Sequence, residues 1–190
     1  MVAFRGKYKY EIQNVVASIS FGHSINLQQV ATAMEDMVEY RPEQFPGLVF
    51  RLNKPKTATL IFSSGKMVCT GARSEKEVYK AVETIINKLK ARGIHLAPNP
   101  RIQIQNIVAS AQLNAEVNLE KAAALFENTM YEPEQFPGLI FRLQNPRVVM
   151  LIFSSGNMVC TGAKKEEDVK NAVETVYKML KQQEVLFERA

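Results

Sequence analysis

Four phenylalanines recur in this sequence as two equivalent pairs. Phe45 lies in Glu-Gln-Phe-Pro-Gly-Leu, and the same six residues return around Phe136. Phe62 ends the apolar run Leu-Ile-Phe-Ser-Ser-Gly, which returns around Phe153. An aromatic ring supplies a flat apolar surface and no proton at neutral pH. These residues therefore suit packing or insertion, and their pattern alone leaves open whether they form a core or a binding surface.

The residues that could carry acid–base or nucleophilic chemistry form no recurring group. His23 and His95 occupy positions that are not equivalent in the two copies, and no metalloprotease, Cys-x-x-Cys, Gly-x-Ser-x-Gly or phosphate-loop pattern occurs. Cys69 and Cys160 are equivalent and lie in apolar strands, so we expect reduced core residues. The sequence predicts no enzyme, no metal site and no cofactor.

The two pairs belong to an internal duplication that covers nearly the whole chain. Residues 12–18 match 104–110, and 60–72 match 151–163, at offsets of 92 and 91. Copies of this length are too long for a solenoid unit, which indicates a duplicated half-domain. Gly93, Pro98 and Pro100 mark the junction, and we divide the chain into repeats 1–97 and 98–190.

Each copy predicts one order of elements: a strand, a short helix, three strands and a long helix. Asn26 and Asn118 are the expected N-caps of the short helices, and Ser74 with Glu77 forms a capping box for the first long helix. Lys165 stands in place of that serine in the second copy. The strands expected in the first copy are 11–21, 48–52, 56–62 and 66–72. We expect roughly eight to ten antiparallel strands and four helices.

Alternation along the strands predicts which side chains share a face of the sheet. Leu60, Phe62, Val68 and Thr70 fall on one face, opposite Ile61. Two long amphipathic helices can cover only one face, which leaves the other open and partly apolar. Such a surface is typical of an interaction site. The alternative is a sandwich in which the second face is buried by the other half or by a second copy.

Charge divides unequally between the copies. Residues 1–97 carry 14 Lys+Arg and 8 Asp+Glu, a net of +6, whereas 98–190 carry 10 and 11, a net of −1. These sum to the overall +5, a mild basic excess that favours a polyanionic partner. No apolar run reaches about 18 residues, and Met1–Lys9 lacks the apolar segment of a secretory signal, so we expect an intracellular protein without a membrane span.

The repeated motifs resemble the TATA-box-binding protein family, over about residues 8–183. The resemblance is carried by Tyr-Glu-Pro-Glu-Gln-Phe-Pro-Gly-Leu-Ile at 131–140, Leu-Ile-Phe-Ser-Ser-Gly, Met-Val-Cys-Thr-Gly-Ala and Ile-Gln-Asn-Ile-Val-Ala-Ser. It implies an archaeal-type α+β fold: a saddle-shaped, ten-stranded antiparallel sheet with four helices on the convex face. It also implies that the concave underside binds and kinks A·T-rich promoter DNA through the minor groove. This family is itself the standard example of such kinking.

The resemblance also assigns site residues. Phe45, Phe62, Phe136 and Phe153 would be the intercalating wedges. The minor-groove contacts would be Asn14 and Asn106 at the centre of the site, together with Thr70, Thr161, Val16, Val68, Val108, Val159, Leu60 and Leu151. The phosphate contacts would be Arg51, Lys56, Lys66, Arg73, Arg142, Arg147 and Lys164. Asn157 stands where the first copy has Lys66 and the family usually has Lys, which puts one phosphate contact of the second copy in doubt.

The partners follow from the same resemblance. Glu132, Glu134 and Gln135 match the turn that the B-type general transcription factor grips, and RNA polymerase would be recruited through that complex. The more basic first half would offer a second surface that faces a partner or DNA, or simply a solvated helix face; its residues are Lys76, Lys80, Lys88, Lys90 and Arg92. The free protein could form a homodimer. Its location would be the archaeal cytoplasm and nucleoid, or the nucleus if the source were eukaryotic. Two alternative functions remain, a sequence-tolerant architectural DNA-bending protein and a scaffold that dimerises through its open sheet.

Overall fold

The computed structural model describes residues 6–188, so the first five residues of Met1–Lys9, the segment expected to lack a secretory signal, fall outside the described residues. Within this range the chain forms twelve strands and four helices. In chain order they are β1 (Tyr8–Ser20), α1 (Leu27–Ala33), β2 (Val38–Tyr40), β3 (Leu48–Asn53), β4 (Lys56–Ile61), β5 (Lys66–Ala72), α2 (Glu75–Lys90), β6 (Arg101–Leu113), β7 (Ala115–Val117), α3 (Leu119–Leu125), β8 (Thr129–Met130), β9 (Leu139–Arg142), β10 (Val149–Ile152), β11 (Asn157–Ala163), α4 (Glu166–Gln182) and β12 (Leu186–Glu188).

Ten of the strands form one sheet in the order β2-β3-β4-β5-β1-β6-β11-β10-β9-β8, and β12 pairs with β7 in a separate two-stranded sheet. The described strand pairs are antiparallel, as the short connections predict. The expected α+β fold with a ten-stranded sheet and four helices is confirmed. The edge strands β2 and β8 were missed because two or three residues are too few to set up an alternation.

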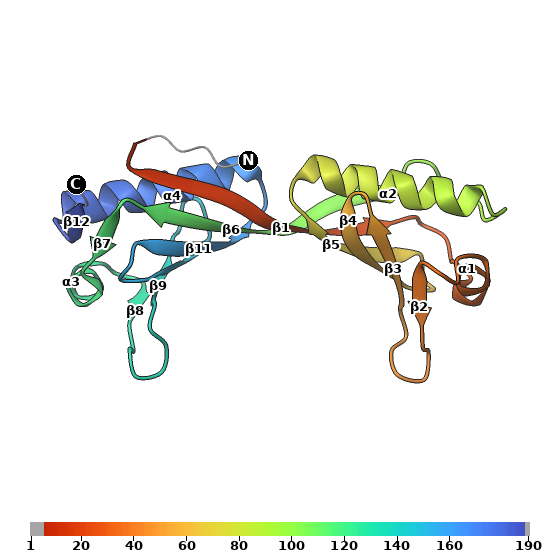
Figure 1. Ribbon diagram of the computed structural model, residues 1–190, viewed down its shortest axis with the longest axis horizontal. Helices are drawn as coiled ribbons and strands as arrows, with labels where there is room; N and C mark the ends of the chain where they lie inside the picture. Colours follow the sequence, from red (N-terminus) through yellow and green to blue (C-terminus); the bar gives the residue numbers. More distant parts are fainter. Residues whose placement is uncertain (1–5, 189–190) are drawn as a thin grey trace. The chain divides into compact units, whose positions relative to one another are not determined.

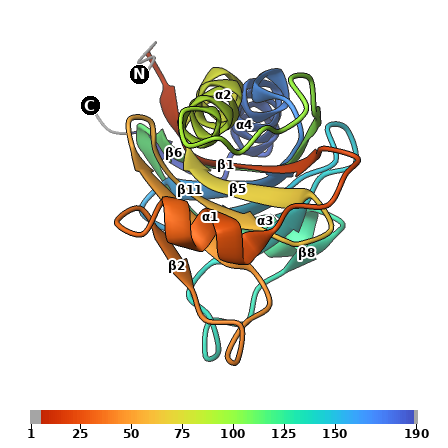
Figure 2. The same cartoon turned by 90° about the vertical axis from the view of Figure 1, so that its right-hand side faces the viewer.

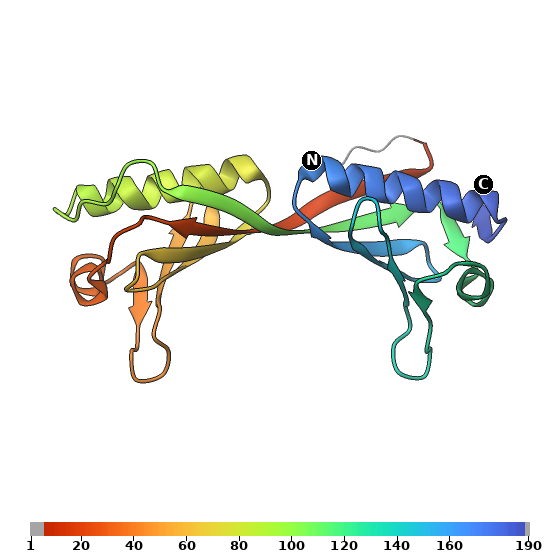
Figure 3. The ribbon, with the colours of Figure 1, turned by 180° about the vertical axis from the view of Figure 1, so that it is seen from behind.

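The chain divides into two compact units. The first unit is Asn14–Gln105, and the second unit comprises the residues up to Gln13 together with those from Asn106 onward. β1 and β6 each contribute to both units, so these units differ from the repeats 1–97 and 98–190, which remain a description of the sequence. Each unit holds one long helix, one short helix and its own part of the sheet (Figures 1 and 3).

In the first unit, strict alternation separates a core face from an uncovered face. Val15, Ala17, Ile19, Phe50 and Ile61 are at most 1% exposed, whereas their neighbours along the strands are partly buried or exposed. α2 lies on the core face, with Val78, Ala81, Val82, Ile85 and Leu89 buried against it. α1 lies beside β2 at the edge, and the opposite face of this unit carries no helix (Figure 2). We call that uncovered face the open face.

The second unit repeats this division. α4 buries Val169, Ala172, Val173, Val176, Tyr177 and Leu180, and the core face of its strands includes Ile107, Ala109, Met150 and Ile152. Two sheet faces are thus each covered by one long helix, as the count of helices predicted. Each open face remains available to solvent in the described chain.

The helix caps explain where the helices begin. Asn26 and Asn118 accept hydrogen bonds from the backbone N–H groups of Gln29 and Lys121, both over 3.1 Å. Ser74 accepts from the N–H of Glu77 over 3.1 Å. The reciprocal bond of the expected capping box is shifted by one residue, because the Glu77 carboxylate accepts from the N–H of Arg73. Lys165 gives α4 no side-chain cap.

Candidate nucleic-acid interface

The open face of the first unit carries a row of small apolar and hydroxyl side chains. Leu60 lies opposite Val49 on β3 and Val68 on β5, and Val68 lies opposite Ser18 on β1. These side chains are all partly buried, and no charged side chain interrupts the row. Such a surface offers shape and dry contact rather than catalysis.

The second unit presents an equivalent row. Leu151 lies opposite Ile140 and Val159, and Val159 lies opposite Ser110. The predicted apolar contacts Val16, Val68, Leu60, Val108, Val159 and Leu151 all lie on the partly buried side of their strands. The structure therefore places each predicted apolar contact on an open face.

Asn14 and Thr70 are brought together on the first unit's open face. The Asn14 Nδ2 amide donates to Thr70 Oγ1 over 3.2 Å. Its Oδ1 accepts the backbone N–H of Gly71 over 2.7 Å. Because a backbone N–H can only donate, the atom facing Gly71 must be the amide oxygen. The Nδ2 group is the end of the amide that remains for other partners.

The same arrangement recurs in the second unit. Asn106 Nδ2 donates to Thr161 Oγ1 over 3.3 Å, and Asn106 Oδ1 accepts the N–H of Gly162 over 2.7 Å. In the described part of the chain the second Nδ2 hydrogen of either asparagine makes no hydrogen bond. Each unit thus holds one asparagine amide with one Nδ2 hydrogen left for another partner.

The phenylalanine pairs form as the repeat predicts. The ring centroids of Phe45 and Phe62 are 6.0 Å apart, and those of Phe136 and Phe153 are 5.7 Å apart. Phe45 is 41% exposed, a large value for such a ring. None of the four rings lies in the core, so the interpretation of Phe62 and Phe153 as core residues is wrong.

Two buried glycines let the rings meet. A Cβ added to Gly47 would lie 2.8 Å from Phe45 Cε1 and 3.0 Å from Phe62 Cε1. At Gly138 the corresponding distances are 2.6 Å to Phe136 Cε2 and 3.0 Å to Phe153 Cε1. Carbon atoms do not approach so closely without displacement, so the Pro-Gly turn needs glycine for space rather than for its backbone conformation.

The turns that carry Phe45 and Phe136 have backbone hydrogen bonds of their own. The Arg41 carbonyl accepts from the N–H groups of Gln44 and Phe45 over 2.9 and 3.0 Å. The Glu132 carbonyl accepts from Gln135 and Phe136 over 2.9 Å each. These bonds hold the rings on turns that project away from the long helix of each unit (Figure 1).

Basic side chains surround the open faces. All seven predicted phosphate contacts are exposed, namely Arg51, Lys56, Lys66, Arg73, Arg142, Arg147 and Lys164. In the second unit, Arg142, Arg147 and Lys164 gather around a depression of about 640 Å³ that also includes Thr161 and Gly162. In the first unit, Lys66 shares a depression of about 530 Å³ with Phe62 and Arg101.

Three polar residues of this surface were missed by sequence reasoning. Gln105 Nε2 donates to Ser18 Oγ over 2.8 Å in the first unit, and Gln13 Nε2 donates to Ser110 Oγ over 2.9 Å in the second. Arg101 lies beside Lys66. The signal for the glutamines was the repeated Ile-Gln-Asn, in which both polar residues recur. The signal for Arg101 was its repeat equivalent Lys9, which is also basic.

The two turns differ in charge. Glu132, Glu134 and Gln135 are exposed in the second unit. The equivalent turn of the first unit carries Arg41, whose Nε lies 3.5 Å from Glu39 Oε1. The second turn is therefore the more acidic of the two, as the sequence indicated.

Groups with reactive potential lie away from the open faces. Cys69 and Cys160 are free and fully buried, and burial raises the pKa of Cys69 and brings that of Cys160 to about 11. Neither thiol is a nucleophile at neutral pH. The described residues contain no group of three His, Cys, Asp or Glu side chains that could hold a metal ion. They also contain no helix long and apolar enough to cross a membrane.

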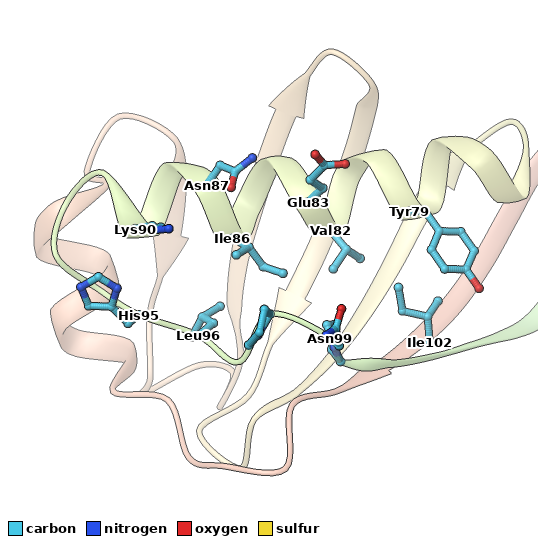
Figure 4. Close-up of a pocket in the computed structure, with 12 residues that line it drawn as sticks. Tyr79, Val82, Glu83, Ile86, Asn87, Lys90, His95, Leu96, Asn99 and Ile102 are labelled. Carbon is cyan, nitrogen blue, oxygen red and sulfur yellow. The ribbon is translucent and has the colours of Figure 1, made fainter.

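A groove on the helix side distinguishes the two units. In the first unit, Ile86 and Tyr79 of α2 face Leu96 and Ile102 across a space of about 610 Å³ (Figure 4). The residue equivalent to Ile86 is Tyr177, which is buried and lies 5.4 Å, between ring centroids, from Tyr8. The groove therefore marks a place that the second unit fills with its own aromatic pair. One basic residue near the end of α2 has a partner within the unit: the Arg92 guanidinium donates to the Ala33 carbonyl at the end of α1 over 2.7 Å.

The sequence pattern described as "Transcription factor TFIID (or TATA-binding protein, TBP)" matches residues 9–91 and 101–183, which is nearly all of both repeats. This chain belongs to the TATA-binding protein family. It is 53% identical over 178 residues to the TATA-box-binding protein of Pyrobaculum aerophilum, covering 94% of this chain and 89% of that relative. It is 57% identical over 169 residues to that of Sulfurisphaera tokodaii, covering 89% and 85%.

A solved structure agrees with this assignment to the TATA-binding protein family. The structure of Methanococcus jannaschii TBP matches with a TM-score of 0.82 and 52% identity, covering 91% of this chain and 98% of that one. The resemblance to archaeal members of the family is therefore confirmed, and with it the role of a general transcription factor. The assignments of individual residues remain predictions.

Proposed function

We propose that this protein binds A·T-rich promoter DNA in the minor groove through its open faces, kinks it by inserting phenylalanines, and recruits a B-type transcription factor and RNA polymerase. The observation that carries the proposal is the matched set on the two open faces. Each has one donor amide, one apolar row and one projecting pair of rings. Kinking by inserted side chains is a behaviour for which this family is itself the standard example.

The proposed preference for A·T pairs follows from the amides and the apolar rows. In the minor groove an A·T pair shows only the acceptors A N3 and T O2, whereas a G·C pair adds the guanine N2 amino group. Asn14 and Asn106 direct donors outward, which suits acceptors. Leu60, Val68, Leu151 and Val159 offer no acceptor to an amino group, so a G·C pair would bury an unsatisfied donor.

The proposed wedges are Phe45 with Phe62 and Phe136 with Phe153. Flat apolar rings inserted into an opened base step offset the cost of unstacking, which is roughly a few kcal/mol per step in the family's own example. The rings are exposed or partly buried, and their turns hold them away from the long helices. The basic residues around each open face would contact phosphates and position the duplex. Asn157 would weaken one such contact in the second unit.

The experiment that tests DNA recognition compares duplexes with and without an amino group in the minor groove. Inosine·cytosine pairs carry no N2 amino group, and diaminopurine·thymine pairs carry one. We expect affinity for an A·T-rich site to survive replacement by inosine·cytosine and to fall on replacement by diaminopurine·thymine. Equal affinity for all three duplexes would instead favour the sequence-tolerant architectural protein. A stable dimer whose sedimentation is unchanged by duplex would favour the scaffold.

The proposed partner surface is the acidic turn of the second unit. Glu132→Lys with Glu134→Lys should leave DNA binding intact and weaken the complex with the B-type factor. The matched control is Glu43→Lys in the turn of the first unit, which should weaken neither. If the double variant forms the ternary complex as well as the parent protein, this assignment is wrong. We also propose that the protein acts inside an archaeal cell, in the cytoplasm and nucleoid.

A further inference from the structure

Gly71 and Gly162 occupy equivalent irregularities in the two units. Between Val15↔Ala72 and Ala17↔Cys69, β5 uses three steps where β1 uses two. Between Cys160↔Ala109 and Ala163↔Ile107, β11 likewise has one more residue than β6. An extra residue in a ladder leaves one backbone N–H without a strand partner. In both units the glycine N–H donates instead to the amide oxygen of Asn14 or Asn106.

The conformation at both positions is one that L side chains rarely adopt. Gly71 and Gly162 each have φ of 97°. A Cβ at Gly162 would meet its nearest neighbour, Val148 Cα, at 3.7 Å, an ordinary contact. At Gly71 it would lie 3.2 Å from the Lys56 carbonyl oxygen. At Gly162, therefore, the backbone conformation rather than space requires glycine, and that conformation aims the N–H at Asn106.

An asparagine amide has two ends of similar shape and opposite hydrogen-bonding character. Turned over, it would present Oδ1, which accepts, in place of Nδ2, which donates. An outward Oδ1 would accept from the N2 amino group of guanine and would lose the contact to A N3 or T O2. The bond from the glycine N–H prevents this, because turning the amide over would set one donor against another.

We propose that Gly71 and Gly162 are specificity-determining positioning residues, whose N–H groups lock the Asn14 and Asn106 amides with their donor ends outward so that the central base pairs must be A·T. This proposal rests on the proposed minor-groove function. In this proposal the glycine N–H at the bulge causes the discrimination against guanine. It does so by orienting the asparagine amide and does not itself contact DNA. Each unit carries its own lock, so each should govern only the base pair that its own asparagine contacts.

The sharpest test removes the Gly162 N–H and keeps everything else. Cys160 allows ligation of a synthetic peptide 160–190 to a recombinant 1–159 thioester, which gives the full chain. Three versions of residue 162 would be compared with ligated parent protein: glycolic acid, which replaces the N–H by an ester oxygen; D-alanine, which keeps both the N–H and positive φ; and Gly162→Ala. Affinity would be measured for sites with A·T or G·C at either central position.

We expect the ester to reduce the preference for A·T over G·C by about tenfold, only at the position read by Asn106. D-Alanine should keep the parent preference, and Gly162→Ala should lose part of it. An unchanged preference in the ester protein would overturn the proposal, and so would an equal loss of affinity for both sites. If the ligated parent protein itself shows no preference for A·T over G·C, the proposed minor-groove function is wrong. That result is distinct from a failure of the glycine proposal, which requires a parent preference that the ester leaves unchanged.

A second measurement tests the proposal without the ester protein, in case that protein does not fold. In the unmodified chain without DNA, hydrogen exchange of the Gly162 N–H is followed before and after Asn106→Ala. The lock requires that loss of the asparagine oxygen speeds exchange at Gly162 and leaves exchange at Gly71 unchanged. Equal exchange at Gly162 in both proteins would refute the bond on which the proposal depends.

Discussion

Gly138 lies so close beneath Phe136 that a Cβ on the glycine would come within 2.6 Å of the ring's Cε2 atom. Because glycine has no Cβ, the Pro-Gly turn leaves the space that the Phe136 ring occupies. Gly47 has the same relationship to Phe45 at 2.8 Å. The glycine of the repeated Phe-Pro-Gly therefore positions the phenylalanine ring by leaving space for it.

Gly138→Ala should displace the Phe136 ring and reduce DNA bending, measured by energy transfer between the ends of a labelled duplex. The ring is partly exposed and can turn away, so the melting temperature should change little. A double-mutant cycle supplies the control, because adding Gly138→Ala to Phe136→Ala should have no further effect on bending. Normal bending by Gly138→Ala would show that the wedge does not depend on this contact.

Phe50→Ala should mainly reduce stability, whereas Phe62→Ala should mainly reduce DNA bending. Phe50 is fully buried on the core face, so its truncation should cost about 3–5 kcal/mol of unfolding free energy. Phe62 lies on the open face, and its truncation should cost much less while reducing DNA bending. Denaturant unfolding and end-to-end energy transfer measure the two quantities. Similar losses of stability in both variants would contradict the assignment of faces.

A serine at position 165 should stabilise the protein. α4 begins without a side-chain cap, whereas Ser74 caps α2. Lys165→Ser should raise the unfolding free energy by about 1 kcal/mol, and Ser74→Ala should lower it by a similar amount. Lys165→Ala separates the cap from the loss of a positive charge near the helix N-terminus. If Lys165→Ala stabilises as much as Lys165→Ser, charge rather than capping is responsible.

Stability should fall as the pH rises through the range set by Cys160. Its pKa is raised by burial from an ordinary 9.0 to about 11. A raised pKa in the folded state means that folding favours the neutral thiol. The stabilisation is therefore complete below pH 9, and it is lost as the pH rises from 9 to about 11. Chemical denaturation across this range measures it, and Cys160→Ala should flatten the dependence. If the unfolding free energy of the parent protein does not change between pH 9 and about 11, this prediction is wrong.

The assignment of side chains to faces could be predicted because a strand alternates with a period of two. Ile61 is buried while Leu60 and Phe62 are only partly buried, as that period requires. The caps Asn26 and Asn118 were equally predictable, since capping depends on residues three positions apart. The end of α3 was less predictable: the helix stops at Leu125 because Phe126 takes an extended conformation, and no proline or glycine marks that position.

The locks on Asn14 and Asn106 could not be predicted, because they depend on the register between distant strands. Nothing in Thr-Gly-Ala indicates that the glycine supplies an extra residue to the ladder opposite Val15. The shared face of Gln13 and Ser110 depends on the pairing of β1 with β6, which no local pattern specifies. The sequence therefore identified which residues recur, and the register decided which of them touch.

The passage of β1 from one unit to the other constrains how the chain can be made. Synthesis delivers every residue of the first unit once Gln105 has left the ribosome, so this unit can fold first. The segment Tyr8–Gln13 is made earliest, yet its partners lie in β6 and beyond, where Asn114 donates to the Lys7 carbonyl over 2.9 Å. Tyr8–Gln13 therefore leaves the ribosome well before the residues from Asn106 onward, with which it forms the second unit.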